Sequence, residues 1–276
     1  MKAPTEDTVV KKRFLVPNLF TGLNFLLGIY SILLMTEAFT SPGSGPVLGS
    51  GKPPLLLAAW FIVWCAMLDK LDGFAAKLLK ASSEFGAQFD SLADLTAFGI
   101  APGFLVYFYS QSADYAWFST HRPLMIVSAS IYMLCAALRL ARFNAIDSGE
   151  LKEYFQGLPS TFSGAFVAVS VILHWKHGLA NSMPRLSPVL PLLLILMGLL
   201  MVSPLYMPKL MRRQNPLFNA FQTANLLAAY LFGFGMMLPE YLYALGLTYG
   251  IIGFANGLIK KEEIENALNP ASKEAG

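Results

Sequence analysis

Long apolar stretches separated by short polar ones run through the whole chain. Eight of them approach the roughly 20 residues that a helix needs to cross a bilayer. Hydrocarbon gives backbone N–H and C=O groups no partners outside their own segment, so such stretches must be helical. The pattern predicts an all-α fold, a polytopic transmembrane bundle of about eight spans. The stretches are 15–36, 54–76, 91–109, 123–143, 160–180, 186–206, 220–237 and 239–259.

Two features refine this prediction without changing the class. The last two stretches adjoin near Pro239 and could form one hairpin, so seven spans is the alternative. Lys11, Lys12 and Arg13 precede the first stretch as they would in a signal peptide. That stretch is as long as a full span, however, and no clear small-residue cleavage site follows it. We expect it to remain as the first helix.

Composition agrees with a membrane protein. Of the 276 residues 55% are hydrophobic and 13% charged, and the mean hydropathy is +0.53. Soluble domains carry about 25% charged residues. We expect one membrane domain at 14–260, a cytoplasmic N-terminal segment at 1–13 and a cytoplasmic C-terminal tail at 261–276. Cys65 and Cys135 lie in apolar stretches and form no zinc or disulfide pattern.

Basic residues orient the predicted bundle. With the N-terminus in the cytoplasm, 16 of the 20 lysines and arginines fall in cytoplasmic segments, as the positive-inside rule requires. An even number of spans returns the C-terminus to the same side. We therefore expect a multi-pass protein of the cytoplasmic (inner) membrane. Both termini, and the acidic residues described next, would lie on the cytoplasmic side.

Four aspartates gather where the second and third stretches meet at this side. Asp69 and Asp72 are three residues apart, and Asp90 and Asp94 are four apart, so each pair shares one face of a helix. Any one of them alone could be an ordinary carboxylate at a helix end. Four charges near a bilayer are costly, however, and so indicate a site. Their oxygens are hard ligands of the kind that Mg²⁺ prefers.

This stretch resembles the signature of the CDP-alcohol phosphotransferases, in which eight positions have fixed spacing. One position departs from the family pattern, because Lys77 stands where the family has arginine. A lysine offers a compact charge, whereas arginine grips phosphate with two parallel hydrogen bonds. The matching positions are Asp69, Asp72, Gly73, Ala76, Lys77, Gly86, Asp90 and Asp94.

The resemblance implies an integral membrane enzyme that moves a phosphatidyl or related group from a CDP-linked lipid to an alcohol and releases CMP. It implies that Asp69, Asp72 and Asp90 bind Mg²⁺ or Mn²⁺, with two divalent ions expected. Asp94 would be the general base, and in some family members it is also a metal ligand. Binding of the CDP group is expected from Asn18, Thr21, Asp69, Asp72, Gly73, Ala76, Lys77 and Gly86.

Three further stretches resemble the serine branch of this family, the CDP-diacylglycerol–serine O-phosphatidyltransferases. They are VPNLFTGLNFLLG from Val16, LRLARFNA from Leu138 and FQGLPS from Phe155. The branch implies CDP-diacylglycerol and L-serine as substrates, phosphatidylserine and CMP as products, and direct displacement as the mechanism. Arg139, Arg142, Asn144 and Gln156 are the candidates for binding serine or phosphate. Such enzymes are commonly dimers, so we expect a homodimer among membrane lipids and no nucleic-acid partner.

Other functions remain as alternatives. Within the family, the acceptor could be glycerol phosphate or inositol phosphate, or the substrate an archaeal-type lipid. Outside it, intramembrane acids could belong to an ion-coupled transporter, although the outer halves of the predicted spans are apolar. A serine transfer of the phospholipase D type needs a His-x-Lys-x4-Asp motif. Here Asn181 follows His174 and Lys176 in the place of that aspartate, so we exclude it.

Overall fold

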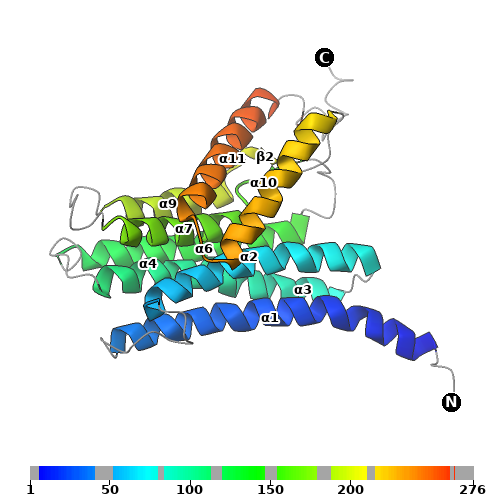
Figure 1. The fold of residues 1–276 in the computed structure, drawn as a ribbon, viewed down its shortest axis with the longest axis horizontal. Helices are drawn as coiled ribbons and strands as arrows, with labels where there is room; N and C mark the ends of the chain where they lie inside the picture. Colours follow the sequence, from blue (N-terminus) through cyan, green and yellow to red (C-terminus); the bar gives the residue numbers. More distant parts are fainter. Residues whose placement is uncertain are drawn as a thin grey trace.

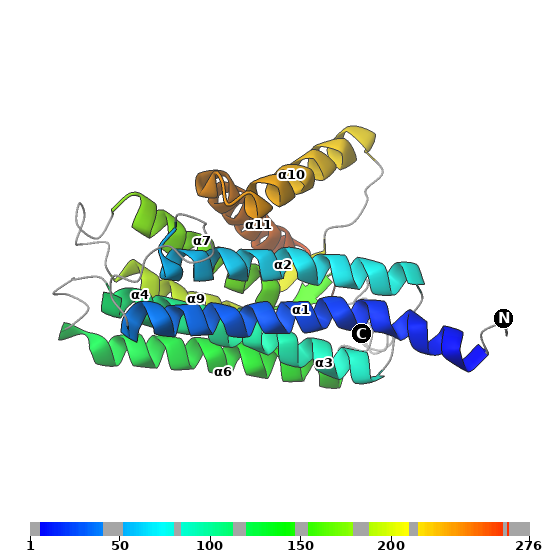
Figure 2. The same cartoon turned by 60° about the horizontal axis from the view of Figure 1, so that its bottom comes forward.

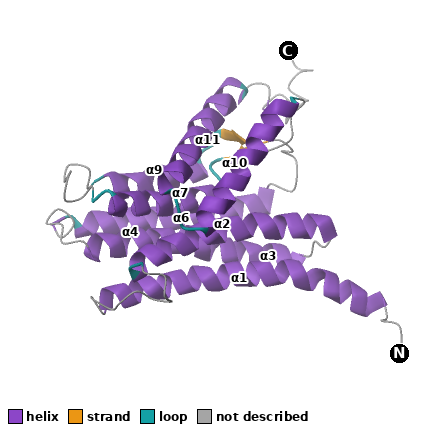
Figure 3. Ribbon diagram, in the orientation of Figure 1, coloured by secondary structure: helices purple, strands orange, loops and turns teal. Residues whose placement is uncertain are grey.

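The computed structural model describes residues 6–40, 52–79, 84–112, 120–146, 154–178, 188–209, 215–261 and 264. Within these ranges the chain is almost entirely helical, with one pair of short strands (Figure 3). The elements are α1 (Glu6–Thr40), α2 (Pro54–Leu79), α3 (Glu84–Asp94), the π-helix η2 (Leu95–Ile100), α4 (Ala101–Ser112), α6 (Arg122–Ile146), β1 (Tyr154–Gln156), α7 (Ser160–Lys176), α9 (Val189–Val202), β2 (Tyr206–Pro208), α10 (Pro216–Phe234) and α11 (Pro239–Ile259).

Each of the eight apolar stretches coincides with a helical segment, so the prediction of a helical membrane bundle is confirmed. The third stretch lies in one continuous rod made of α3, η2 and α4. Within the described ranges, five segments are long and apolar enough to cross a membrane, namely Asn18–Thr40, Pro54–Leu71, Glu84–Gln111, Arg122–Ala145 and Pro239–Ile259. The helix α9 is apolar but has only 14 residues, and α7 has 17. The chain is a multi-pass membrane protein.

Two groups of helices differ in direction. The helices α1, α2, α4, α6, α7 and α9 lie side by side along the long axis of the bundle (Figure 1). The last two, α10 and α11, form a hairpin that is inclined to the others and projects from one side (Figure 2). The predicted hairpin near Pro239 is therefore present, and the site described below belongs to the first group.

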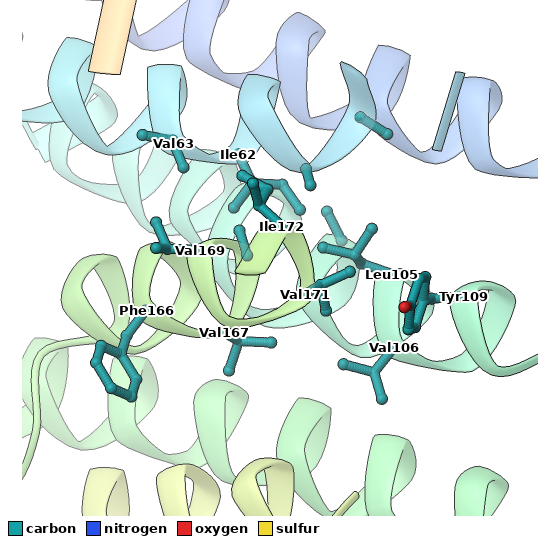
Figure 4. Packing of buried hydrophobic residues seen from close by; sticks show 14 of the residues in the cluster. Ile62, Val63, Leu105, Val106, Tyr109, Phe166, Val167, Val169, Val171 and Ile172 are labelled. Carbon is teal, nitrogen blue, oxygen red and sulfur yellow. The ribbon is translucent and has the colours of Figure 1, made fainter. Parts of the chain in front are cut away.

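The helix α7 lies between the rest of the first group and α11, with α2, α4 and α9 on its other sides. Apolar residues occur on all of its faces, which is the pattern of a helix packed on every side. Val169 and Ile172 of α7 lie near Ile62 of α2, and Val171 lies near Leu105 of α4 (Figure 4). The centre of the bundle is therefore a close-packed support for the residues at the start of α7.

A small antiparallel sheet, which the sequence did not predict, fixes the approach to α7. Tyr154 of β1 is opposite Pro208 of β2, and Gln156 is opposite Tyr206. Gly157 follows β1 with a φ of +77°, a conformation that favours glycine, and a Cβ there would collide with the carbonyl oxygen of Met201. The chain then turns through Pro159 into α7.

Candidate active site

Three of the four predicted aspartates meet at one end of the bundle. Asp69 comes from α2 and Asp90 and Asp94 from α3, and one carboxylate oxygen of each lies within 4.8 Å of the others. Asp90 and Asp94 are one helical turn apart and so share a face. The sequence predicted this meeting, and the side chain of Asp72, the fourth aspartate, lies outside the described part of the structure.

The aspartate cluster fits a divalent cation. Three carboxylates repel one another at this separation, and a cation between them reverses that interaction. Asp94 is buried, and its Oδ1 has no hydrogen-bond partner among the described residues. Buried polar atoms are nearly always paired, so an unpaired carboxylate oxygen beside two others indicates a bound ion or ligand. The donors are all hard oxygens, which suits Mg²⁺ or Mn²⁺.

A π-helical turn begins directly after Asp94. Such turns widen an α-helix locally and are frequent at functional sites. Here the Tyr132 hydroxyl of α6 donates to the Phe98 carbonyl at 2.8 Å. Gly164 of α7 faces the same turn, where an added Cβ would lie 2.9 Å from the Phe98 Cα. These contacts fix the rod that carries Asp90 and Asp94 against α6 and α7.

The first turn of α7 completes the site. The Thr161 hydroxyl donates to Oδ2 of Asp69 at 3.1 Å, and Arg139 donates through Nη1 to the Ser160 hydroxyl at 2.7 Å. Thr161 was not predicted from the sequence as a site residue. Ser160 belongs to the FQGLPS stretch but was also not singled out. The only signal was a pair of hydroxyl residues at the start of an apolar stretch.

Arg139 is one of the predicted binding residues that the fold brings to the aspartates. Its side chain is 8% exposed, and its guanidinium lies 5.6 Å from the centre of the Phe143 ring. Ser160, which accepts its hydrogen bond, is the neighbour of Thr161, which donates to Asp69, so the guanidinium and this carboxylate meet the same turn of α7. A buried guanidinium beside the carboxylates offers a binding group for a carboxylate or phosphate of a substrate.

Arg142 lies one turn further along α6 and has a different environment. Its guanidinium donates to the carbonyl oxygens of Gln156 at 3.0 Å, Met201 at 3.2 Å and Val202 at 3.0 Å. These contacts join β1 to the end of α9. Asn144 donates to the hydroxyl of Ser91, the residue after Asp90, at 2.9 Å on an exposed surface. Among the described residues, the hydrogen bonds of the Arg142 guanidinium go to backbone carbonyls and not to the three clustered aspartates.

The residues predicted to bind the CDP group are only partly described. In α1, Thr21 is buried and Asn18 half-buried. Gly86 is half-buried at the start of α3, and Gly73 is exposed on α2. The side chains of Ala76 and Lys77 lie outside the described part of the structure.

Asn24 is a polar residue of α1 that the sequence analysis also missed. It is fully buried, and both polar atoms of its amide have no partner among the described residues. Cys65, one turn before Asp69, donates through Sγ to the Asn24 backbone carbonyl at 3.5 Å. The Asn24 backbone therefore lies about one helical turn from Asp69, measured along the axis of α2. A polar residue three positions after Thr21 inside an apolar stretch was the available signal.

Comparison with known proteins assigns the chain to a family. The family model for CDP-alcohol phosphatidyltransferase matches residues 14–207. A CDP-diacylglycerol–serine O-phosphatidyltransferase of Helicobacter pylori is 34% identical over 196 residues, which cover 71% of this chain and 72% of that protein. Proteins of the same name from Methanocaldococcus jannaschii and Saccharomyces cerevisiae are 32% and 37% identical. These two matches cover 74% and 53% of this chain, and 86% and 50% of the relatives. The chain belongs to the CDP-alcohol phosphatidyltransferase family.

Proposed function

We propose that this protein transfers the phosphatidyl group of CDP-diacylglycerol to the hydroxyl of L-serine and so forms phosphatidylserine and CMP. The observation that carries the proposal is the cluster of Asp69, Asp90 and Asp94 beside the buried Arg139. The names of the relatives from Helicobacter pylori and Methanocaldococcus jannaschii support serine as the acceptor. Membership of an enzyme family favours this function over an ion-coupled transporter.

In this proposal the aspartates hold the metal. Asp69, Asp72 and Asp90 would bind Mg²⁺ or Mn²⁺, with Asp94 as a further ligand. When bound, two such ions supply positive charge for the diphosphate and for the charge that develops on the leaving CMP. Asn18, Thr21, Gly73, Ala76, Lys77 and Gly86 are proposed to contact the CDP group.

The residues of the chain then handle the acceptor. Asp94 accepts the proton of the serine hydroxyl, because an alcohol is a poor nucleophile until a base removes that proton. The serine oxygen forms a bond to the phosphorus of the phosphatidyl group. The bond from that phosphorus to the bridging oxygen breaks, and CMP leaves with the electron pair. Arg139 would bind the serine carboxylate or a phosphate.

Arg142, Asn144 and Gln156 were predicted with Arg139 as binding groups for serine or phosphate. We retain Asn144, which is exposed and contacts Ser91, the residue after Asp90, as a binding candidate. We assign Arg142 to the support of the site, because three backbone carbonyls accept its hydrogen bonds. The Gln156 side chain stays a candidate, since the contact to Arg142 uses only its backbone oxygen.

The setting of the reaction is also part of the proposal. We propose a homodimer in the cytoplasmic membrane, with the aspartates and both termini on the cytoplasmic side and residues 14–260 as the catalytic domain. The charge distribution along the chain supports this orientation. Serine would then reach the aspartates from the cytoplasm and the lipid donor from the bilayer.

An acceptor panel tests the function. The purified full-length protein is given CDP-diacylglycerol with labelled serine, glycerol 3-phosphate or inositol 1-phosphate, in the presence and absence of a chelator. We expect label in lipid from serine only, and only without the chelator. Incorporation of another acceptor in place of serine would contradict the serine assignment while keeping the family chemistry. Incorporation that is unaffected by the chelator would contradict the metal.

A further inference from the structure

We propose that Ser160 and Thr161 are positioning residues that fix the distance between the aspartates and Arg139. Thr161 holds Asp69, and its neighbour Ser160 holds Arg139. One helical turn therefore contacts both charged partners of the site. This inference rests on the proposed function, because it assigns a role at the same site.

The contact of Thr161 fixes the orientation of one metal ligand. Its hydroxyl comes from α7 and donates to Oδ2 of Asp69 on α2, so it joins two helices that are distant in sequence. A carboxylate has lone pairs on both oxygens, and one hydrogen bond leaves the others for a cation. Residues that orient a metal ligand in this way typically change metal affinity or activity by about 10- to 100-fold when they are replaced.

The contact of Ser160 holds the cation of the site. Ser160 is fully buried and accepts a hydrogen bond of 2.7 Å from Nη1 of Arg139. Hydrogen bonds from a charged donor are shorter and stronger than those between neutral groups. This bond uses one of the five N–H donors of the guanidinium. Arg139 is thereby held toward α7 and the aspartates.

The start of α7 is itself held firmly. The backbone N–H of Leu158 donates to the Leu200 carbonyl at 3.0 Å, and the backbone N–H of Gly157 donates to the Leu205 carbonyl at 2.7 Å. Arg142 adds its bond to Gln156, and Gly164 packs closely against η2. Ser160 and Thr161 therefore cannot move far without moving the bundle. This rigidity is what a positioning role requires.

Binding of Mn²⁺ tests the role of Thr161 without relying on turnover. The full-length protein is titrated with Mn²⁺, and the free ion is followed by electron paramagnetic resonance. Thr161→Val keeps the shape of the side chain but removes the hydroxyl, and Thr161→Ser keeps the hydroxyl. Thr36→Val is the matched control, because the Thr36 hydroxyl donates to Ile32 within its own exposed helix surface. Thr161→Ala replaces the valine variant if that protein does not fold.

We expect Thr161→Val to weaken Mn²⁺ binding by about 10-fold or more. We expect Thr161→Ser and Thr36→Val to bind as the wild type does, and the metal-free melting temperatures to stay close. Wild-type affinity in Thr161→Val would overturn the role of Thr161. Weak binding in Thr161→Ser as well would also overturn it, since packing of the methyl group would then explain the effect.

Ser160→Ala provides the complementary measurement. We expect it to raise the KM for serine with a smaller change in kcat, and to leave Mn²⁺ affinity as in the wild type. An unchanged KM would overturn the role of Ser160. A wild-type protein that binds no Mn²⁺ would contradict the proposed metal site itself. A wild type that binds Mn²⁺ but transfers to another acceptor would contradict only the serine assignment, and the KM is then measured for that acceptor.

Discussion

At the scale of single residues, the chemistry depends on how a few polar groups are paired inside an apolar bundle. Asp94 is buried beside two other carboxylates, and its Oδ1 has no partner in the part of the chain that the structure describes. Arg139 is equally buried but has a hydroxyl partner. The contrast separates a group that is ready to accept a proton or a ligand from one that is held in place.

Asp94→Asn should reduce turnover by about 10²- to 10⁴-fold, because an amide cannot accept the proton of the attacking hydroxyl. Binding of CDP-diacylglycerol should persist, since the substitution changes neither size nor shape greatly. Rates of labelled serine incorporation and equilibrium binding of the labelled donor measure the two effects. Turnover equal to that of the wild type would remove Asp94 from the role of base.

Asn24→Leu tests the buried amide of α1. A buried polar atom without a partner costs about 1–3 kcal/mol, so an apolar side chain of similar volume should preserve or raise the melting temperature of the free protein. We expect turnover to fall nonetheless, because we expect the amide to gain its partner from the bound substrates. Thermal unfolding and serine incorporation are measured together on the same preparation.

Ser31→Ala is the matched control for Asn24→Leu. Ser31 is also buried in α1, but its hydroxyl donates to the Ala58 carbonyl at 2.9 Å. This substitution should lower stability by about 1 kcal/mol and leave turnover unchanged. Full activity in Asn24→Leu would show that the amide has no part in the reaction.

At the scale of elements, the sequence predicts the helices well and their mutual contacts poorly. The bilayer forces long apolar stretches to be helical, and the spacing of Asp90 and Asp94 places them on one face. The contact of Thr161 with Asp69 spans 92 residues, however, and no local pattern encodes it. The short sheet and the π-helical turn also depend on tertiary partners. The same limit explains why Arg139 and Arg142 looked equivalent in sequence.

Arg142→Ala should therefore act on stability before it acts on substrate. The variant removes three hydrogen bonds to the carbonyls of Gln156, Met201 and Val202. A hydrogen bond that involves a charged group stabilises the folded protein by about 1.5–3 kcal/mol. We expect a lower melting temperature and similar changes in the KM of both substrates. Arg139→Ala should instead raise the KM for serine selectively. A selective serine effect in Arg142→Ala would return that arginine to the binding site.

Gly164→Ala tests the close approach of α7 to η2. The added Cβ would lie 2.9 Å from the Phe98 backbone, so one of the two elements has to shift. We expect a loss of stability of about 1–3 kcal/mol and weaker Mn²⁺ binding. Gly250→Ala in α11 is the control, because its Cβ would meet only ordinary contacts, at 3.7 Å or more. Equal melting temperatures of the two variants would show that this approach is not tight.

At the scale of the whole molecule, metal and fold should be coupled. The aspartates repel one another when no cation is bound, and α2 and the rod of α3, η2 and α4 meet at that point. A ligand that binds only the folded protein stabilises it by about 2.7 kcal/mol at 100 times its Kd. We expect Mn²⁺ to raise the melting temperature of the wild type and a chelator to reverse the effect. Asp69→Ala should lose this response, and its persistence would place the metal elsewhere.

The position of α7 beside α11 has a consequence for how the enzyme responds to its lipids. Bilayers of different thickness act on the helices they touch, by changing their tilt. The α10–α11 hairpin is largely uncovered on its outer surface, but α11 packs against α7 through Tyr243 on Phe166 and Tyr249 on Phe162. Reconstitution into thin and thick membranes should therefore shift the orientation of the hairpin, and α11 would pass that shift to α7 and so to Thr161, which changes the affinity for Mn²⁺. The reaction centre would then sense the acyl-chain composition of the membrane around it.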